Sequence, residues 1–207
     1  MTLFPSKRFG DILSFAQSYF DEYTRASSAI DLSSLDRCRA ALEKVIAERG
    51  SIFSCGNGGS ASISNHMVCD HVKGISTDTD KVPKVHSLSS NVEILTAIAN
   101  DISYDDTYCY QLQRLGSAGD AVITISSSGD SESIVRAIRM AKDMGMVSIA
   151  FSGFSGGRSA KEADINVHVP SENYGVIEDI HQSLMHILAQ FIRMDGMPDD
   201  LLGQRKF

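Results

Sequence analysis

The sequence predicts an α/β fold in which a parallel sheet is covered on both faces by helices. Short apolar runs alternate with helical stretches along most of the chain, and this alternation is typical of parallel sheets. Two of the apolar runs, 51–55 and 121–125, end in Gly- and Ser-rich turns that each open a helix. The 207 residues, 43% hydrophobic and 22% charged, suit a single globular domain.

Two helices are expected before the first strand. Apolar residues at helical spacing, from Phe9 to Tyr23, mark a helix over about 7–27. A second helix begins at Ser33 or Ser34, as N-cap, and runs to Gly50. We expect these N-terminal helices, about 7–49, to pack as a hairpin whose remaining apolar surface contacts another subunit.

The strands and helices that follow are expected in alternation. After the strand at 51–55, further strands are predicted at 84–88, 121–125, 146–151 and 165–169. Helices are predicted over about 60–73, 91–99, 134–145, 158–163 and 174–194. The remaining residues, about 196–207, form a short C-terminal tail, which we expect to be an ordered extension or a frayed end.

Charge and composition exclude several classes of function. The net charge of -7 argues against nucleic acid as a partner, since binding to a phosphate backbone needs clustered Lys and Arg. A small phosphate ligand is not excluded, because backbone N–H groups and hydroxyls can hold it. No apolar run is long enough for a membrane span, and no signal peptide is apparent. The four cysteines lack CxxC spacing and are expected to be reduced thiols in a cytoplasmic protein.

Two strand-to-helix turns are candidates for anion binding. The first, 55–61, reads CGNGGSA, and its glycines let the backbone approach a ligand at the start of a helix. The second, 126–131, reads SSSGDS and places four hydroxyls at a helix N-terminus. Ligands of open parallel sheets bind at the carboxyl ends of strands, where both turns lie.

A plainer interpretation of these turns is that their serines only cap helices. One serine would be explained in this way, but four serines around a glycine after a buried strand favour phosphate binding. The first turn is not a Walker A sequence, because no GK[ST] follows, and its glycine spacing differs from the dinucleotide-binding GxGxxG.

Four segments in order give the chain a resemblance to a known family. They are GNGGSASISNH at 56–66, TAIANDISYDD at 96–106, GDAVITISSSGDS at 119–131 and IEDIHQSLMHIL at 177–188. Together they resemble the sugar isomerase (SIS) domain, in its phosphoheptose isomerase subgroup, over nearly the whole chain. The resemblance implies one SIS domain over 1–207, a three-layer sandwich with a five-stranded parallel sheet flanked by helices. It also implies a homotetramer with sites at subunit interfaces.

The resemblance implies a function and a set of site residues. The family converts sedoheptulose 7-phosphate into a heptose 7-phosphate for surface glycan biosynthesis. Catalytic roles fall on Asp70 and His186. The residues at substrate-binding positions are Asn57, Gly58, Ser60, Asp101, Ser126, Ser127, Ser128, Ser131 and Glu178. Metal-binding positions are His66, Asp70, Glu178 and His186, where some members hold zinc.

The sequence departs from the family pattern at four of these or nearby positions. Asp70 stands where the family has Glu, so its carboxylate lies about 1.5 Å further back along the side chain. Glu178 replaces a Gln and adds a negative charge, while Gly175 and Gly74 stand where Asp and Arg are usual. These changes bear on the choice of substrate.

The candidate residues suit an aldose–ketose isomerisation. Proton transfer between C1 and C2 needs a base over the carbon pair and an acid near the carbonyl oxygen, roles open to Asp70 and His186. His66 and Asp70, four residues apart, share a helix face. Two His and two carboxylates also suit zinc. Taken alone, these side chains would be a surface His–Asp pair and a core histidine.

Two other functions remain open from the sequence. The same fold serves in a tetrameric, non-enzymatic regulator that binds a replication-initiation protein, although a scaffold has no need of Asp70 and His186. A sugar-phosphate sensor of a transcription regulator would need a separate DNA-binding partner, because the chain has no helix-turn-helix segment to spare.

Overall fold

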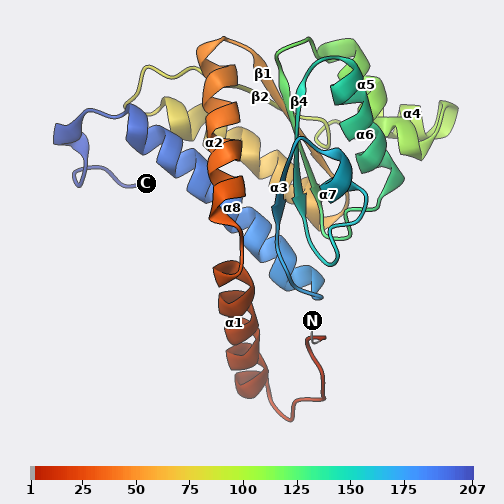
Figure 1. The fold of residues 1–207 in the computed structure, drawn as a ribbon, viewed down its shortest axis with the longest axis vertical. Helices are drawn as coiled ribbons and strands as arrows, with labels where there is room; N and C mark the ends of the chain where they lie inside the picture. The colour runs from red at the N-terminus through yellow and green to blue at the C-terminus, as the bar shows by residue number, and fades with distance from the viewer. Residues whose placement is uncertain (1–2) are drawn as a thin grey trace.

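The computed structural model describes residues 3–207 and contains a five-stranded, all-parallel sheet (Figure 1). The strand order is β2-β1-β3-β4-β5. The strands are β1 (Ser51–Gly56), β2 (Lys84–Ser87), β3 (Ala121–Ser126), β4 (Val147–Ser152) and β5 (Ile165–His168). The α/β class and all five predicted strands are confirmed. Because β1 and β3 are neighbours, the turns that follow them open at the same edge of the sheet.

Helices cover both faces of this sheet and give three layers. They are α2 (Leu32–Ala47), α3 (Gly59–Val68), α4 (Val92–Asp101), α5 (Thr107–Leu115), α6 (Glu132–Asp143), α7 (Ser159–Glu162) and α8 (Tyr174–Gly196). Alternate residues of each strand enter opposite cores. Ile123 packs with α2, α3 and α8, whereas its neighbour Val122 packs with α5 and α6.

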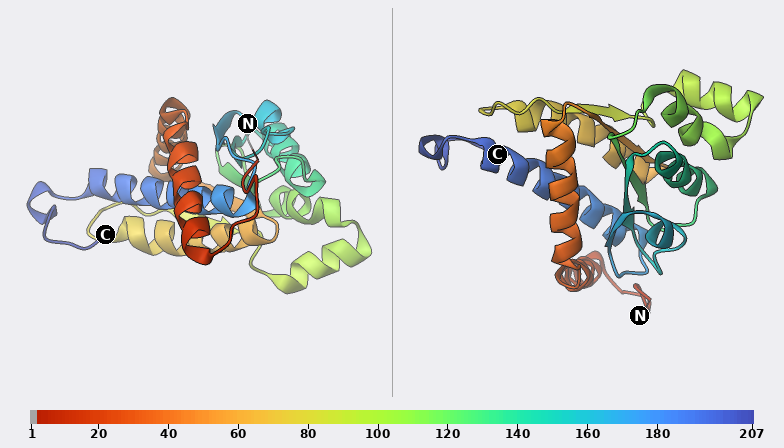
Figure 2. Two further views of the ribbon diagram at one scale, coloured as in Figure 1. Left: turned by 90° about the horizontal axis from the view of Figure 1, so that it is seen from below. Right: turned by 45° about the horizontal axis from the view of Figure 1, so that its top comes forward.

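The N-terminal helices α1 (Ile12–Ser28) and α2 form as the sequence predicts, but not as a hairpin. Asp11 and Asp31 cap them by accepting from the backbone N–H groups of Ser14 and Ser33. The two helices line up in the view of Figure 1, but the right-hand view of Figure 2 shows α1 almost end-on while α2 is seen along its length, so the chain bends sharply between them. The reason lies in their partners. The α2 helix buries its apolar stripe on the sheet, whereas α1 reaches α8 through Tyr19, whose hydroxyl donates to Asp179 at 2.7 Å.

Helices α3 and α8 lie side by side on one face of the sheet and run in the same direction (Figure 2). Gly59 and Glu178 meet near the start of both helices, while Asp70 and His186 meet further along. The α3 helix continues as a π-helix over Cys69–Gly74, in which Ile75 N–H donates to the Asp70 carbonyl. Such wider turns are rare and occur frequently at functional sites.

One helix differs from the sequence prediction. The helix α5 was not expected, because its residues are polar at many positions and follow a 3₁₀ turn at Tyr104–Asp106.

Of the two alternatives expected for the C-terminal tail, the structure has the ordered extension, which folds back on α8. Arg193 donates to the Lys206 carbonyl at 3.1 Å and lies 4.7 Å from the Phe207 ring. None of the helices within residues 3–207 is long and apolar enough to cross a membrane.

Candidate active site

A small cavity lies between the turns that follow β1 and β3. Its volume is about 160 Å³. Its lining is mostly hydroxyl and amide side chains, namely Asn57, Ser60, Ile125, Ser126, Ser127, Ser128, Ser131, Tyr174 and Glu178. Among the described residues, those that line the cavity include no Lys, Arg or His. The structure therefore brings together two predicted turns that are about 70 residues apart in the sequence.

The second turn is held rigidly by its neighbours. Gly129 has a φ of 66°, and a Cβ at this residue would collide with the Gly156 carbonyl group. Ser159 donates to the Gly129 carbonyl oxygen from its backbone N–H at 2.9 Å and from its hydroxyl at 2.7 Å. Ser126 accepts from the Gly129 N–H at 3.1 Å. The loop is thus shaped before any ligand arrives.

Ser127 marks the floor of the cavity. It is only 5% exposed, and its hydroxyl has no hydrogen-bond partner among the described residues. Buried hydroxyls are almost always paired, and an unpaired one costs about 1–3 kcal/mol. A ligand oxygen in the cavity would satisfy it.

The first turn is fixed by two tyrosines that the sequence analysis did not identify. Tyr104 and Tyr108 each donate to the Asn57 side-chain oxygen at 2.9 Å. The Asn57 amide in turn donates to Ser133 at 3.1 Å. Gly58 takes a positive φ of 55° and lets the chain turn into α3. The tyrosines lie within and just after the segment 96–106, but nothing in their spacing indicates this contact.

Glu178 is the one acidic side chain that lines the cavity. Its carboxylate packs against Gly59 at the start of α3, where a Cβ would come within about 2.6 Å of it. Burial, assisted by the nearby Asp179 carboxylate, raises the pKa of Glu178 above its usual range. A phosphate in this cavity would therefore meet a carboxyl group that is protonated more easily than an ordinary Glu.

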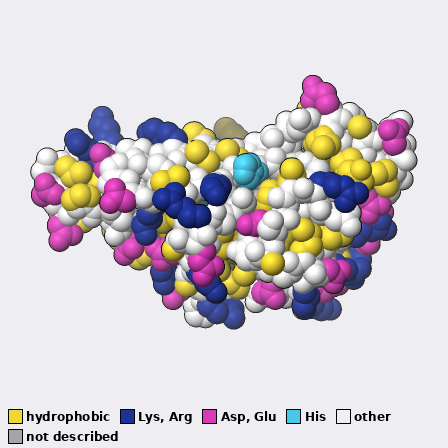
Figure 3. Space-filling model, turned by 90° about the horizontal axis from the view of Figure 1, so that it is seen from above, with side chains coloured by type: hydrophobic (Ala, Val, Ile, Leu, Met, Phe, Trp, Pro, Cys, Tyr) yellow, Lys and Arg dark blue, Asp and Glu magenta, His cyan; other side chains and the backbone are white. Residues whose placement is uncertain are grey.

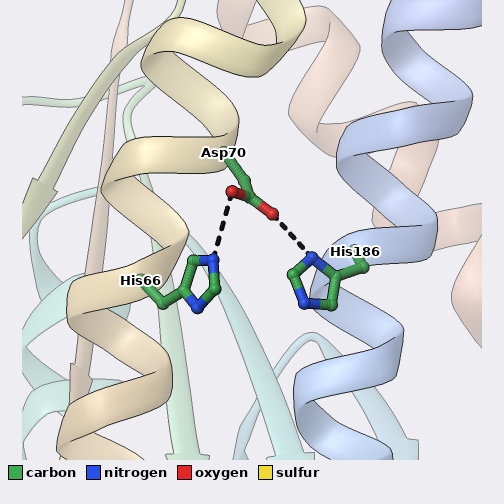
Figure 4. A group of neighbouring side chains, drawn as sticks. All are labelled: His66, Asp70 and His186. Carbon is green, nitrogen blue, oxygen red and sulfur yellow. Dashed lines mark hydrogen bonds and ion pairs between the residues drawn. The ribbon is translucent and has the colours of Figure 1, made fainter. Parts of the chain in front are cut away.

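Asp70, His66 and His186 form a second cluster, further along α3 and α8 (Figure 4). The Asp70 carboxylate lies 2.6 Å from His186 Nδ1 and 3.3 Å from His66 Nε2. Each of the three residues offers a ligand atom within 4.8 Å of the others. His66 and Asp70 share one helix face, as their spacing predicts, and α8 brings His186 against them.

Gln182 joins this cluster, although the sequence analysis did not select it. Its side-chain nitrogen lies 2.9 Å from His186 Nε2 and 3.3 Å from His66 Nδ1. Gln182 is one turn before His186 on α8, and this i, i+4 spacing is the only sequence signal that points to it.

Two predicted residues lie away from their expected places. Glu178 was expected among the metal ligands, but it lines the hydroxyl-rich cavity and is not part of the cluster that could hold a metal in residues 3–207. Eight residues of α-helix separate Glu178 from His186, which is about 12 Å. Asp101 was expected to contact the sugar, but it lies exposed at the end of α4 and accepts a hydrogen bond from Asn100 at 2.7 Å.

A wider cavity borders Asp70 from the other side. Its volume is about 320 Å³, and Lys73, Arg193, Lys206 and Phe207 contribute to its wall. The folded C-terminal tail therefore closes one approach to Asp70. The carboxylate lies between this basic hollow and the two histidines.

The arrangement can bind an anion at one end of α8 and move protons at the other. Hydroxyls and backbone N–H groups suit a phosphate group. A carboxylate in hydrogen-bonding distance of an imidazole suits general acid–base catalysis. Two imidazole nitrogens and a carboxylate oxygen at this spacing are also a donor set that zinc accepts.

Comparisons with known proteins agree with this geometry. The SIS domain family model matches residues 18–153. A phosphoheptose isomerase from Roseiflexus sp. is 36% identical over 143 residues, which cover 69% of this chain and 72% of the relative. One from Halorhodospira halophila is 33% identical over 182 residues, covering 86% of this chain and 91% of the relative.

A solved structure supports the same assignment. The phosphoheptose isomerase from Neisseria gonorrhoeae superposes with a TM-score of 0.81 at 27% identity, covering 89% of this chain and 100% of that one. Fold, sequence and the order of the motifs agree, and the chain belongs to the SIS domain family and, within it, to the phosphoheptose isomerases.

Proposed function

We propose that this chain is an aldose–ketose isomerase that converts sedoheptulose 7-phosphate into the corresponding heptose 7-phosphate. One observation carries the proposal. The hydroxyl-lined cavity and the Asp70–His186 pair both involve α8, on which Glu178 of the cavity lining and His186 are separated by a helical rise of about 12 Å. The names of the relatives point to the same reaction.

The separation suits a long sugar phosphate. From phosphorus to C1, an extended seven-carbon 7-phosphate spans about eight bonds, or roughly 10 Å at about 1.2 Å per bond. This length is of the same order as the helical rise from Glu178 to His186, which supports a long-chain sugar phosphate.

The reaction then needs only proton transfers. Asp70 removes a proton from C1 while His186 donates one to the C2 carbonyl oxygen, which gives an enediol. Asp70 then returns a proton to C2 while His186 accepts the proton of the C1 hydroxyl, which gives the aldose. Both groups end in the protonation state in which they began. The 2.6 Å contact between Asp70 and His186 supports this proposal, because it puts the proposed base and the proposed acid side by side.

We also propose that His66, Asp70 and His186 hold a divalent metal, with zinc the best match to two imidazoles and a carboxylate. Such an ion supplies Lewis-acid stabilisation of negative charge on the substrate oxygens. Metal analysis of the purified protein, and zinc titration after chelation, test this assignment.

The direct test of the proposed function is incubation with sedoheptulose 7-phosphate in deuterated water. We expect an aldose product and solvent deuterium at the exchanged carbon, both visible by NMR. Asp70→Asn and His186→Ala should each lower kcat by about 100- to 10,000-fold. Ser28→Ala, at an exposed position of α1, is the control and should not change kcat. Absence of product and of deuterium, with and without added zinc, would exclude this substrate.

We further propose that residues 1–207 act as one domain and that copies assemble into a homotetramer with sites at subunit interfaces. Exposed apolar residues support an assembly. On α8 and α2 they include Ile187 and Leu32, 50% and 68% exposed. At the α4 end of the molecule, Figure 3 shows hydrophobic side chains gathered on the surface. Light scattering during size-exclusion chromatography tests the assembly size.

A non-enzymatic regulator is the competing function, and the observations do not favour it. The relatives named above are isomerases, and the cluster pairs a carboxylate with two imidazoles, which a scaffold does not need. If a strain that depends on this protein grew normally with both Asp70→Asn and His186→Ala, the regulator would be the better interpretation.

A further inference from the structure

Gln182 contacts both imidazoles of the His66–Asp70–His186 cluster, on the sides that face away from Asp70. Asp70 contacts one nitrogen of each imidazole, at 2.6 Å for His186 Nδ1 and 3.3 Å for His66 Nε2. Gln182 contacts the remaining nitrogen of each, at 2.9 Å for His186 Nε2 and 3.3 Å for His66 Nδ1. All four imidazole nitrogens therefore have a partner within this group of four side chains.

The donor and acceptor inventory favours one arrangement of protons. An ionised carboxylate only accepts, so in the 2.6 Å hydrogen bond His186 Nδ1 carries the proton and donates it to Asp70. His66 Nε2, which lies 3.3 Å from the same carboxylate, matches it best when it also carries the ring proton. In neutral rings the opposite nitrogens are then acceptors. The Gln182 amide group has two N–H donors, one for each of these nitrogens.

We propose that Gln182 is a positioning residue that fixes the tautomers of His66 and His186, and with them the nitrogens that face Asp70. Without Gln182, the nitrogen of each ring that faces away from Asp70 could either donate a hydrogen bond to water or accept one from it. The amide supplies the second contact that selects one tautomer. Gln182 is suited to this role because it is half-buried and lies one helical turn from His186.

The same residue has a second consequence if the cluster takes up a metal. A metal held by the nitrogens that face Asp70 would move the ring protons to the opposite nitrogens, which then become donors. Gln182 must then turn its amide and present the oxygen, which can accept from both rings. Partners of this kind on the far side of ligand histidines typically change metal affinity by about 10- to 100-fold.

The experiment compares two substitutions of similar shape. Gln182→Met removes the hydrogen bonds, and Gln182→Glu keeps only acceptors. Gln113→Met, on the exposed face of α5, is the matched control. The ring ¹⁵N shifts of the metal-free protein are read at pH 8, where free imidazole is neutral. Zinc affinity is measured by competition with a chromophoric chelator.

We expect one tautomer per ring in the unsubstituted protein, Nε2–H for His66 and Nδ1–H for His186. Gln182→Met should give a mixture of tautomers and about 10- to 100-fold weaker zinc binding. Gln182→Glu should bind zinc at least as tightly as the unsubstituted protein. Unchanged ring shifts and zinc affinity in Gln182→Met would overturn the inference, because packing alone would then explain Gln182.

The catalytic meaning of this inference rests on the proposed function, but its readouts do not. If the ring shifts follow the expectation while sedoheptulose 7-phosphate gives no product, the isomerase proposal fails and the role of Gln182 stands. If turnover is normal and the ring ¹⁵N shifts of His66 and His186 do not change in Gln182→Met, only the inference about Gln182 fails.

Discussion

At the scale of single residues, the hydroxyl-lined cavity has an uneven electrostatic balance. Its serines and the α3 N-terminus attract an anion, while Glu178 opposes one. No cationic side chain lines the cavity within the described residues to offset that carboxylate. Burial reduces the conflict in part, because it raises the pKa of Glu178 and makes the carboxylate easier to protonate.

We therefore expect Glu178→Gln to tighten phosphate binding. The amide keeps the shape and removes the charge, so KM for the sugar phosphate should fall by about 3- to 10-fold, on the order of 1 kcal/mol. In the unsubstituted protein, ionisation of Glu178 should weaken phosphate binding, and the substitution should remove this component of the pH dependence of KM. Steady-state kinetics between pH 5 and 8 measure both effects. An unchanged KM at every pH would show that the carboxylate does not face the phosphate.

Asp70 is the second residue at this scale. Its short side chain suggested a misplaced base, yet its carboxylate already lies 2.6 Å from His186 Nδ1. Adding a methylene should push the carboxylate past this position. Asp70→Glu is therefore expected to lower kcat by about 10- to 100-fold, measured by product formation under saturating substrate. The kcat of Asp70→Asn should be lower than that of Asp70→Glu. If Asp70→Glu had a higher kcat than the unsubstituted protein, this reasoning would be wrong.

At the scale of elements, the turn after β3 depends on one glycine. Gly129 combines a positive φ with a close approach to the Gly156 backbone, so a methyl group is both strained and crowded. Gly129→Ala should lower the free energy of unfolding by about 3 kcal/mol and weaken phosphate binding. Gly119 serves as the control that separates backbone strain from crowding. It has a φ of 89° but open space around it, so a methyl group there is strained without being crowded. Gly119→Ala should cost only about 1 kcal/mol in urea unfolding.

Elements with a strong local signal were predictable from the sequence. The five strands are apolar runs, and the turn at 126–131 shows its hydroxyls directly. Features set by packing were not predictable. Three such features depend on which helices become neighbours. They are the course of the chain from α1 into α2, the contact of Tyr108 with Asn57, and the position of Glu178. No spacing within one segment encodes such contacts.

At the scale of the whole molecule, two histidines outside the site govern stability in acid. His71 and His181 are fully buried, and burial lowers the pKa of each to about 4. The unfolded chain binds protons on these rings near pH 6.5, while the folded chain does not. Their stabilisation is therefore present above pH 6.5 and is lost as pH falls toward 4.

Each buried histidine should remove about 2 kcal/mol from the free energy of unfolding between pH 7.5 and 5. Urea unfolding at the two pH values measures the total. His181→Gln keeps a donor for the Ser152 carbonyl, which His181 contacts at 3.2 Å. This variant should lose about half of the pH dependence. If it kept the full dependence, other groups would be responsible for the acid sensitivity.

The π-helix at Cys69–Gly74 is a position where the chain can lose one residue with little structural change. A π-turn holds about one residue more than a regular α-turn, so a chain that lacked Val72, which is 41% exposed, could continue with regular i→i+4 bonds. The sheet and α8 would be untouched, because removal of the extra residue lets the following residues keep nearly the same orientation, and only those beside the deletion would shift. Natural or engineered variants one residue shorter here should still fold, but with Lys73 facing a different neighbour and the wall beside Asp70 rebuilt.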